Sequence, residues 1–576
     1  MPIAAPAAHR GYRMHRRYRF AALAVGAAML TACGKSADKN APLAFVPADT
    51  PYVYADIEPT PSAVTEQWSR RMQEYLPAAL GVYENALDRI GAAKPDDAHA
   101  IAAARALIDT LKTHDTWDKL RELGLKPDMR VAFYGVGLVP VLRFELGDAA
   151  KFRSTIADIE HRSGTAMPTA KLGGQDYWYL GNDAVVGLFA IEGSQFVATV
   201  APARSSDALK RTLLGIDRPS QSLADSGALE KLAKQYGYSN YGEGFVDVVR
   251  IAERLTGPAQ GSDREIAQSL GLPTGGSDAA CKSEYLDLAH KFPRLVMGAN
   301  ELSAKRVRIG AQLEMQPALA AQLATALGAA PGTGTPGAGV LDVALSLPVL
   351  KLKDFWIAQA DAVAAKPFAC ASLAELNSGF ANLKKKIDIT VPPPASDLTG
   401  VRFTLDSFDM GAGAAPTPVF SGKALMASDN PAAALAMAQL ALPPLKDLKV
   451  AADAKPVALP AGTIPKVDLP VFVAMSPKAL AVAVGKGEDA TLGAYLNAPA
   501  ANEPVFLRMT FSGKFYGMLA HTFENVKAML PAEKQAQLDQ QSKLMAVYEN
   551  WIRSADIEMV ATPTGIALRE TVEQNP

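Results

Sequence analysis

The sequence predicts an α+β protein built as two tandem related units, in which antiparallel strands pack with helices and a Pro/Gly-rich segment joins the units. Three observations predict this class. Short apolar strands follow one another across tight glycine turns, helices stand between groups of strands without alternating with them, and the order of elements occurs twice. A chain of 576 residues with 49% apolar residues is long enough for more than one domain and apolar enough for large cores.

Composition divides the chain into five segments. Residues 1–32 have the pattern of a signal peptide, and residues 33–43 are a short polar tether that lifts the folded part off a membrane. The two units occupy residues 44–326 and 340–576. Residues 327–339, LGAAPGTGTPGAG, join them, and this composition is typical of a flexible or semi-extended linker.

The first unit opens with an alternating strand at residues 52–56. Ser62 is placed to cap a helix whose apolar residues repeat every four positions as far as Pro77, where the helix should kink or end because proline removes a backbone donor. A second helix is expected over residues 98–123. Residues 130–146 are apolar on both sides of a glycine-rich turn, which predicts an antiparallel strand pair.

Two strands and three helices complete the predicted part of this unit. Asp148 stands where a helix N-cap belongs, ahead of an apolar stripe that predicts a helix. Residues 184–192 and 194–201 predict two strands joined by a glycine. Residues 205–215 and 226–237 predict helices.

The second unit repeats the order of the first. Asp148 and Asp429 occupy matching cap positions, and the last matching segment has the order helix, strand, turn, strand in both units. This order predicts an internal duplication, although chance similarity between alanine-rich helices stays open as the alternative. The matching segments are 144–160 with 424–440, 188–215 with 471–498, and 283–317 with 545–576.

The amino terminus indicates export and lipid attachment. Five arginines and no acid precede an eleven-residue apolar run, Phe20–Leu30, which is too short to span a membrane. The run ends in Leu-Thr-Ala-Cys, which resembles the lipobox of bacterial lipoproteins. This resemblance implies that the chain is cut before Cys33 and that acyl chains on Cys33 anchor it in the membrane. Gly34 after the cysteine favours the outer membrane, facing the periplasm.

Two alternatives stay open for this segment. An ordinary secreted protein with a chance cysteine has a similar leader, and either Met1 or Met14 is the start of translation.

Removing the leader takes away five basic residues and no acid, which leaves 53 basic against 59 acidic residues and a formal charge of −6. A mildly acidic surface argues against nucleic acid as a partner.

Cys281 and Cys370 are the other two cysteines of the chain. An even pair in an oxidising compartment predicts a disulfide, and two unpaired buried thiols are the alternative.

Specific catalytic and cofactor motifs are missing from the sequence. Residues 332–337 fit G-x-G-x-x-G, but they lie in the joining segment and not between a strand and a helix. Residues 428–430, SDN, lack the Ser-x-x-Lys and Lys-Thr-Gly partners of a penicillin-binding site and are explained better as a helix cap before Pro431. No two histidines stand at metal-ligand spacing. The sequence therefore predicts no metal or cofactor and leans away from an enzyme.

One aromatic cluster is the candidate ligand site. Tyr177, Trp178 and Tyr179 stand together, and the matching part of the second unit has no aromatic residues. Aromatic faces stack on sugars or hold apolar ligands, so these three are the candidate binding residues, with core packing as the alternative. Residues 235–245 form a second tyrosine-rich cluster.

The segments FVPADTPYVYADIEP and SLADSGALEKLAKQYG resemble parts of uncharacterised bacterial envelope proteins that begin with a P-A-D-T strand. This resemblance implies a periplasmic α+β protein and supplies no catalytic residues. The expected function is binding of a ligand or envelope partner by a lipoprotein, in a cleft between the two units. An envelope hydrolase with a site assembled from distant residues, and a structural or assembly factor, are the alternatives.

Overall fold

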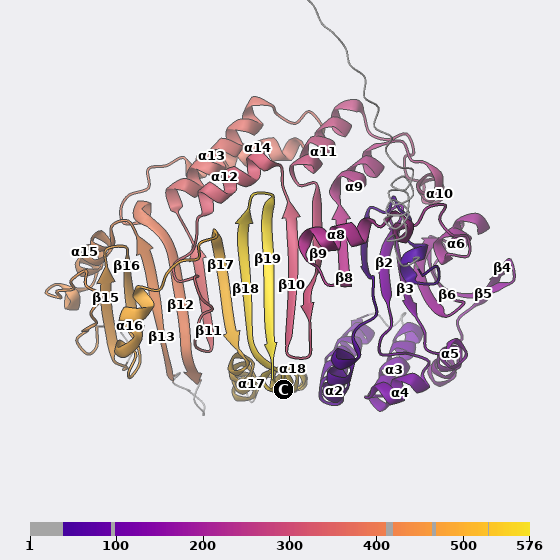
Figure 1. The fold of residues 1–576 in the computed structure, drawn as a ribbon, viewed down its shortest axis with the longest axis horizontal. Coiled ribbons are helices and arrows are strands. Elements are labelled where there is room, and N and C mark those ends of the chain that lie inside the picture. Colours follow the sequence, from indigo (N-terminus) through magenta and orange to yellow (C-terminus); the bar gives the residue numbers. More distant parts are fainter. Residues whose placement is uncertain (1–37, 94–97, 410–418, 464–467, 528, 576) are drawn as a thin grey trace, which may run out of the picture.

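The computed structural model describes residues 38–93, 98–409, 419–463, 468–527 and 529–575. Over these residues the chain forms seventeen α-helices and one antiparallel sheet of nineteen strands (Figure 1). The predicted α+β class is therefore confirmed at this level. The signal peptide and Cys33 lie outside the described residues.

The strands form a single sheet in which every neighbouring pair is antiparallel. From one edge to the other, the strands are β4 (Thr169–Leu172), β5 (Gln175–Gly181), β6 (Val185–Glu192), β7 (Gln195–Pro202), β3 (Val139–Glu145), β2 (Val131–Val136), β1 (Tyr52–Asp56), β8 (Tyr241–Asp247), β9 (Arg294–Leu302), β10 (Arg306–Glu314), β19 (Gly565–Gln574), β18 (Ile552–Thr562), β17 (Val505–Ser512), β11 (Leu341–Ser346), β12 (Leu398–Asp409), β13 (Val419–Ser428), β16 (Ala479–Val484), β15 (Val471–Ser476) and β14 (Val457–Ala458).

The order of strands is the same on both sides of the central pair, β10 and β19. Outward from β10 it runs β9, β8, β1, β2, β3, β7, β6, β5. Outward from β19 it runs β18, β17, β11, β12, β13, β16, β15, β14. The central strands pair over nine positions, from Arg306–Glu573 to Glu314–Gly565. The sequence suggested a cleft between the two units. Where β10 meets β19, the structure has continuous strand pairing instead.

The helices gather mainly at the two ends of the strands (Figure 1). At one end lie α2 (Ser62–Ala93), α3 (Ala98–Thr113), α4 (Trp117–Glu122), α5 (Ala149–Ser163), α17 (Gly513–Lys527) and α18 (Ala532–Trp551). At the other end lie α9 (Val248–Thr256), α11 (Ala279–Lys291), α12 (Pro317–Leu327), α13 (Val349–Ala365) and α14 (Ala374–Ile387). The remaining helices are α6 (Asp207–Leu214), α7 (Leu223–Ser226), α8 (Ala228–Tyr236), α10 (Gly261–Ser269), α15 (Pro431–Ala441) and α16 (Asp489–Leu496).

Three local predictions for the helices need correction. Pro77 does not end α2, which continues through it to Ala93. The single helix expected over 98–123 is two helices, α3 and α4, because the chain leaves helical geometry at Thr116, whose side chain caps α4. Asp429 does not cap α15; Asn430 does, since Pro431 fills the first helical position.

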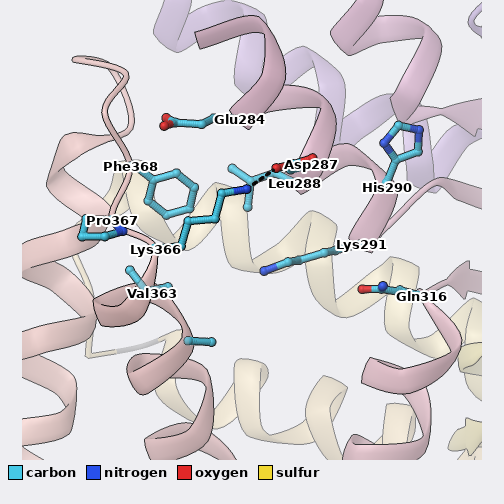
Figure 2. A pocket seen from close by; sticks show the side chains of 11 residues that line it. Glu284, Asp287, Leu288, His290, Lys291, Gln316, Val363, Lys366, Pro367 and Phe368 are labelled. Atoms are coloured by element: carbon cyan, nitrogen blue, oxygen red, sulfur yellow. Dashed lines mark hydrogen bonds and ion pairs between the residues drawn. The ribbon is translucent and has the colours of Figure 1, made fainter. Parts of the chain in front are cut away.

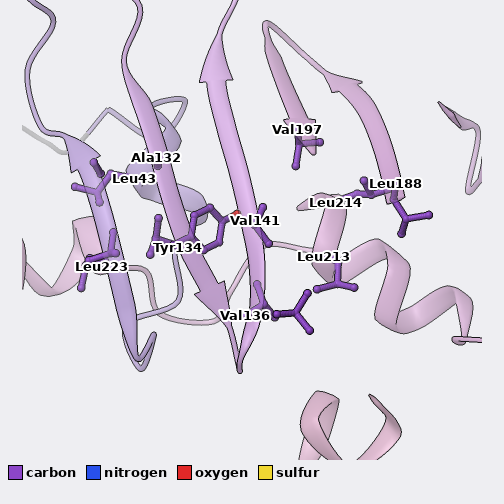
Figure 3. Close-up of a cluster of buried hydrophobic side chains, with 14 of the residues drawn as sticks. Leu43, Ala132, Tyr134, Val136, Val141, Leu188, Val197, Leu213, Leu214 and Leu223 are labelled. Carbon is purple, nitrogen blue, oxygen red and sulfur yellow. The ribbon is translucent and has the colours of Figure 1, made fainter. Parts of the chain in front are cut away.

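The main cores lie on one side of the sheet. In the first half, Tyr134 and Val141 of the sheet pack against Leu213 and Leu214 of α6 and Leu223 of α7 (Figure 3). In the second half, Leu425, Ala474 and Ala481 pack against Leu492 and Leu496 of α16. Alternation along each strand supplies these side chains, because every second residue points to the same side.

Both predicted connecting segments pack against the folded body. Ala330 and Thr333, in the segment expected to be a flexible linker, are buried, and Arg508 Nη1 donates to the Thr333 carbonyl at 2.6 Å. In the predicted tether, Ala41 and Leu43 are buried. Small side chains and backbone carbonyls suit close packing, which composition alone does not distinguish from a free linker.

Candidate functional site

One side of the sheet carries an unbroken row of paired apolar residues. Directly opposite residues of antiparallel strands point to the same side of a sheet. Following these pairs crosses seventeen strands and meets only apolar side chains and one glycine. The row is Trp178, Phe189, Ala198, Leu142, Phe133, Tyr54, Gly244, Met297, Ala311, Leu568, Met559, Leu507, Leu345, Val401, Met426, Leu480 and Met475. We call this side of the sheet the apolar face.

A second row, two residues along each strand of the second half, has the same character. It begins at Ile309 and contains one charged residue, Glu570. The row is Ile309, Glu570, Ile557, Met509, Val343, Phe403, Ala424, Val482 and Val473. Strands stand about 4.8 Å apart, so the first row extends for about 75 Å along the sheet.

The apolar face is open to solvent over much of its length. Nine of its large side chains keep 37% to 49% of their surface exposed: Leu180, Val185, Val200, Leu142, Phe133, Tyr54, Ile309, Leu568 and Phe403. Soluble proteins rarely expose contiguous apolar patches above a few hundred Å², and larger ones mark binding surfaces. The apolar face is therefore the leading candidate for the functional site.

Helices cover this face near the ends of strands, and at β15 the face is buried, since Val473 and Met475 are 4% and 7% exposed. Phe152 of α5 lies against Phe144 and Phe196, with ring centroids 6.0 and 5.3 Å away. Phe515 of α17 lies 5.6 Å from Phe511 in the same way. These contacts place helical walls along one margin of the apolar face and leave its middle uncovered.

The opposite side, which we call the packed face, holds buried charges in pairs. Arg402 binds Asp342 at 3.1 Å, and Arg508 binds Asp556 at 2.8 Å. Lys423 contacts Asp406 at 2.7 Å, and burial alone would lower the pKa of this amine, but its acidic partners raise it. These pairs satisfy charges that would otherwise be costly to bury. The packed face therefore holds the sheet to its covering segments.

Glu243 is an exception on the packed face. It is completely buried, and among the described residues no basic side chain pairs with its carboxyl group, which lies close to the backbone amides of Asn240 and Gly242. Burial, reinforced by the nearby Asp56 carboxyl, raises the pKa of Glu243 to about 8. The group is therefore mainly protonated at neutral pH.

The three sequence-predicted aromatic residues do not form one site. Trp178 points to the apolar side, where it is only 6% exposed among Leu146 and Ile191, and the Arg153 guanidinium lies 5.0 Å from its ring centre. Tyr177 and Tyr179 point to the packed side. Trp178 therefore lies on the other side of the sheet from Tyr177 and Tyr179, because neighbouring residues of a strand face opposite ways, and ligand binding by these residues stays a prediction.

Tyr177 and Tyr179 do line a cavity of about 580 Å³ beside β5 and β6, which we call the tyrosine pocket. Apolar side chains form part of its wall, and Asn182, Asp183, Arg204 and Lys210 form its polar part. This pocket lies on the packed side and is distinct from the apolar face, although Leu180 contributes to both.

A smaller cavity of about 310 Å³ lies between α11 and α13 (Figure 2). Its polar groups are largely engaged with each other. Lys366 Nζ lies 3.0 Å from Asp287, and the Glu284 carboxylate accepts hydrogen bonds from the backbone of Ala369 and Cys370 at 2.7 and 3.0 Å. We interpret this cavity as a seam between packed helices.

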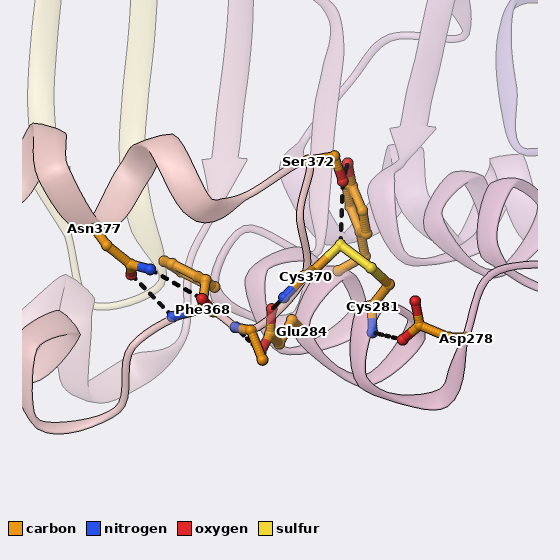
Figure 4. The surroundings of a disulfide bond; sticks show 9 residues. Asp278, Cys281, Glu284, Phe368, Cys370, Ser372 and Asn377 are labelled. Carbon is orange, nitrogen blue, oxygen red and sulfur yellow. Dashed lines mark hydrogen bonds between the residues drawn. A yellow bond between two sulfur atoms is a disulfide. The ribbon is translucent and has the colours of Figure 1, made fainter.

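A disulfide joins Cys281 to Cys370 beside that seam (Figure 4). Their Cα atoms are 4.6 Å apart. Asp278 caps α11 by accepting from the Cys281 amide at 2.8 Å, and Glu284 holds the loop that carries Cys370. The bond connects α11 to the segment between α13 and α14.

Over the described ranges, no three His, Cys, Asp or Glu side chains come together in a way that would hold a metal ion. In the same part of the chain, none of the helices combines the length and the hydropathy needed to cross a bilayer.

No protein-family model matches this chain, and no curated protein or solved structure matches it either.

Proposed function

We propose that this protein is a lipid-binding lipoprotein of the bacterial envelope, which holds the acyl chains of lipids on the apolar face. The observation that carries the proposal is the seventeen-residue apolar row, in which Leu142, Phe133, Tyr54 and Leu568 are 37% to 45% exposed. Transfer of hydrocarbon from water onto such a surface is favourable by roughly 25 cal/mol for each Å² buried.

Hydrocarbon fits this face better than polypeptide does. Within the sheet the strand backbones are hydrogen-bonded to neighbours on both sides, so the middle of the face offers few donors or acceptors. An extended peptide lying there would lose hydrogen bonds to water without replacing them. Met297, Met559 and Met509 add flexible side chains that adapt to chains of varied shape.

Anchoring through Cys33 would keep this face near a membrane. Residues from Asp38 onward are held by the folded body, since Asp38 pairs with Arg130 at 2.7 Å. The five steps from Cys33 to Asp38 reach at most about 18 Å. On this proposal the protein stands at the periplasmic surface of the outer membrane, where acyl chains are available.

The sheet is proposed to have arisen by duplication of one α+β unit, with residues 327–339 as the joint. The repeated strand order on both sides of β10 and β19 supports this origin. Duplication would also account for the continuity of the apolar face from β10 to β19, because both copies would have apolar residues on the same side of the sheet.

Lipid binding is tested with the full-length protein purified from membranes. We expect organic extraction and mass spectrometry to recover acyl lipids, and delipidated protein to take up palmitate and a dioleoyl phospholipid. Phe403→Asp and Leu568→Asp should weaken this uptake by about tenfold or more, since each places a charge on the apolar face. Leu440→Asp, on an 83% exposed position of α15, is the matched control.

Two results would overturn the proposal. One is protein that carries no lipid and takes up neither probe. The other is a lipid-free dimer that the same two variants dissociate, because the occupant of the face would then be a second copy of the chain. Light scattering of wild type and variants distinguishes the two.

A further inference from the structure

The tyrosine pocket has the composition of a second binding site that does not depend on the apolar face. Its two aromatic rings lie 6.2 Å apart and are tilted by 46°. Tyr177 is 6% exposed and Tyr179 36% exposed, so one ring forms the wall and the other the rim. Neither hydroxyl bonds to another described residue. A cavity of about 580 Å³ is in the range that holds small ligands.

The pocket has an excess of positive charge. Arg204 and Lys210 both line it, and within the described part of the chain neither pairs with an acid. Asp183 is the single carboxylate of the lining. Charge-assisted hydrogen bonds from such cations are among the stronger contacts available to a ligand. Two unpaired cations beside one acid favour a ligand with a negative group.

The remaining polar groups suit hydroxyls. The Asn182 side-chain oxygen accepts from the amides of Ala184 and Val185, at 2.9 and 3.0 Å, which fixes the side chain. Its amide nitrogen therefore remains a donor, and the Asp183 carboxylate is an acceptor. Tyrosine rings offer flat faces for the C–H side of a sugar ring.

We propose that the tyrosine pocket binds an anionic saccharide, a sugar ring that bears a carboxylate or a phosphate. Tyr177 and Tyr179 contact the ring, Asn182 and Asp183 bind its hydroxyls, and Arg204 and Lys210 bind the negative group. A carboxylate and a phosphate would both bind Arg204 and Lys210, and the probes of the test distinguish the two groups.

The test uses the full delipidated chain and titration calorimetry, with saturation-transfer NMR to detect weak binding. The probes are glucuronate, glucose 6-phosphate, glucose and inorganic phosphate. We expect one or both anionic sugars to bind, and glucose and phosphate to bind about tenfold more weakly or not at all. Preference for glucuronate or for glucose 6-phosphate identifies the source of the charge.

Variants assign the binding to the pocket. Arg204→Gln with Lys210→Gln should weaken the anionic sugars by about tenfold and leave glucose unchanged. Tyr179→Ala should weaken every sugar. Lys446→Gln with Lys449→Gln removes the same charge elsewhere and should change nothing. Lack of sugar binding at about 10 mM, equal binding of glucose, equal binding of phosphate alone, or insensitivity to the Arg204 and Lys210 changes would each overturn the proposal.

Discussion

Glu243 buries a carboxyl group without a basic partner, and its burial makes the stability of the fold depend on pH. Its pKa rises from 4.5 to about 8 in the folded protein. The folded state therefore holds the proton more tightly than the unfolded state. The resulting stabilisation is complete below about pH 4.5 and is lost as pH rises through about 8.

We expect Glu243→Gln to match wild type in unfolding free energy at about pH 5 and to exceed it by about 1–3 kcal/mol at about pH 9. Glutamine keeps the shape of the side chain and cannot ionise. Urea unfolding at the two pH values measures the difference. Glu253→Gln, on the exposed side of α9, is the control and should show no gain. Equal stabilities of wild type and Glu243→Gln at high pH would contradict the expectation.

Some single residues are predictable from local sequence patterns and others are not. The cap at Asp148 is confirmed, because its carboxylate accepts from two amides of α5. The aromatic cluster at residues 177–179 is visible in the sequence, and alternation along a strand implies that Trp178 faces the other side of the sheet from Tyr177 and Tyr179. Arg204 and Lys210 are far from Tyr179 in sequence and join it only through the β6–β7 pairing, so no local pattern indicated the tyrosine pocket.

At the scale of elements, the disulfide fixes α11 to the segment between α13 and α14. It closes a loop with a sequence separation of 89, and closure of such a loop stabilises mainly by restricting the unfolded chain. We expect Cys281→Ser to lower the free energy of unfolding by about 2–4 kcal/mol.

Guanidinium unfolding with and without reductant checks this value. The double variant, Cys281→Ser with Cys370→Ser, should resemble reduced wild type. If reductant leaves the unfolding of wild type unchanged, the bond does not contribute as expected.

Most elements of the first half were predictable from local patterns. The strand pair at 130–146 is confirmed as β2 and β3, and the strands predicted at 184–192 and 194–201 are confirmed as β6 and β7. The error at Pro77 has a physical origin, since packing of α2 against α18, with Tyr75 and Trp551 rings 5.8 Å apart, outweighs one lost hydrogen bond.

At the scale of the whole molecule, the pairing of β10 with β19 was not predictable. These strands are more than 250 positions apart, and neither contains a signal for its partner. The apolar face has a trace in the sequence: in strands such as VAFYGV and YVYAD, apolar residues occupy both alternating sets of positions, the exposed set as well as the buried one. Such strands are expected to be covered on both sides.

Attachment to the membrane is a prediction for the whole chain. We expect Cys33→Ser to release the protein from membranes into the soluble periplasmic fraction, because the acyl chains on Cys33 are the proposed anchor. Fractionation followed by immunoblotting measures the distribution. A Cys33→Ser protein that still sediments with the outer membrane would show that another surface holds it there.

The placement of β19 has a consequence for biogenesis. The first half is synthesised with the edge of β10 unpaired, because β19, its neighbour in the sheet, follows some 250 residues later. An exposed strand edge beside an apolar sheet is a template for misassembly. A chaperone that shields β10 until the last strand arrives would therefore raise the yield of folded protein, and truncation before residue 565 should leave a product that aggregates.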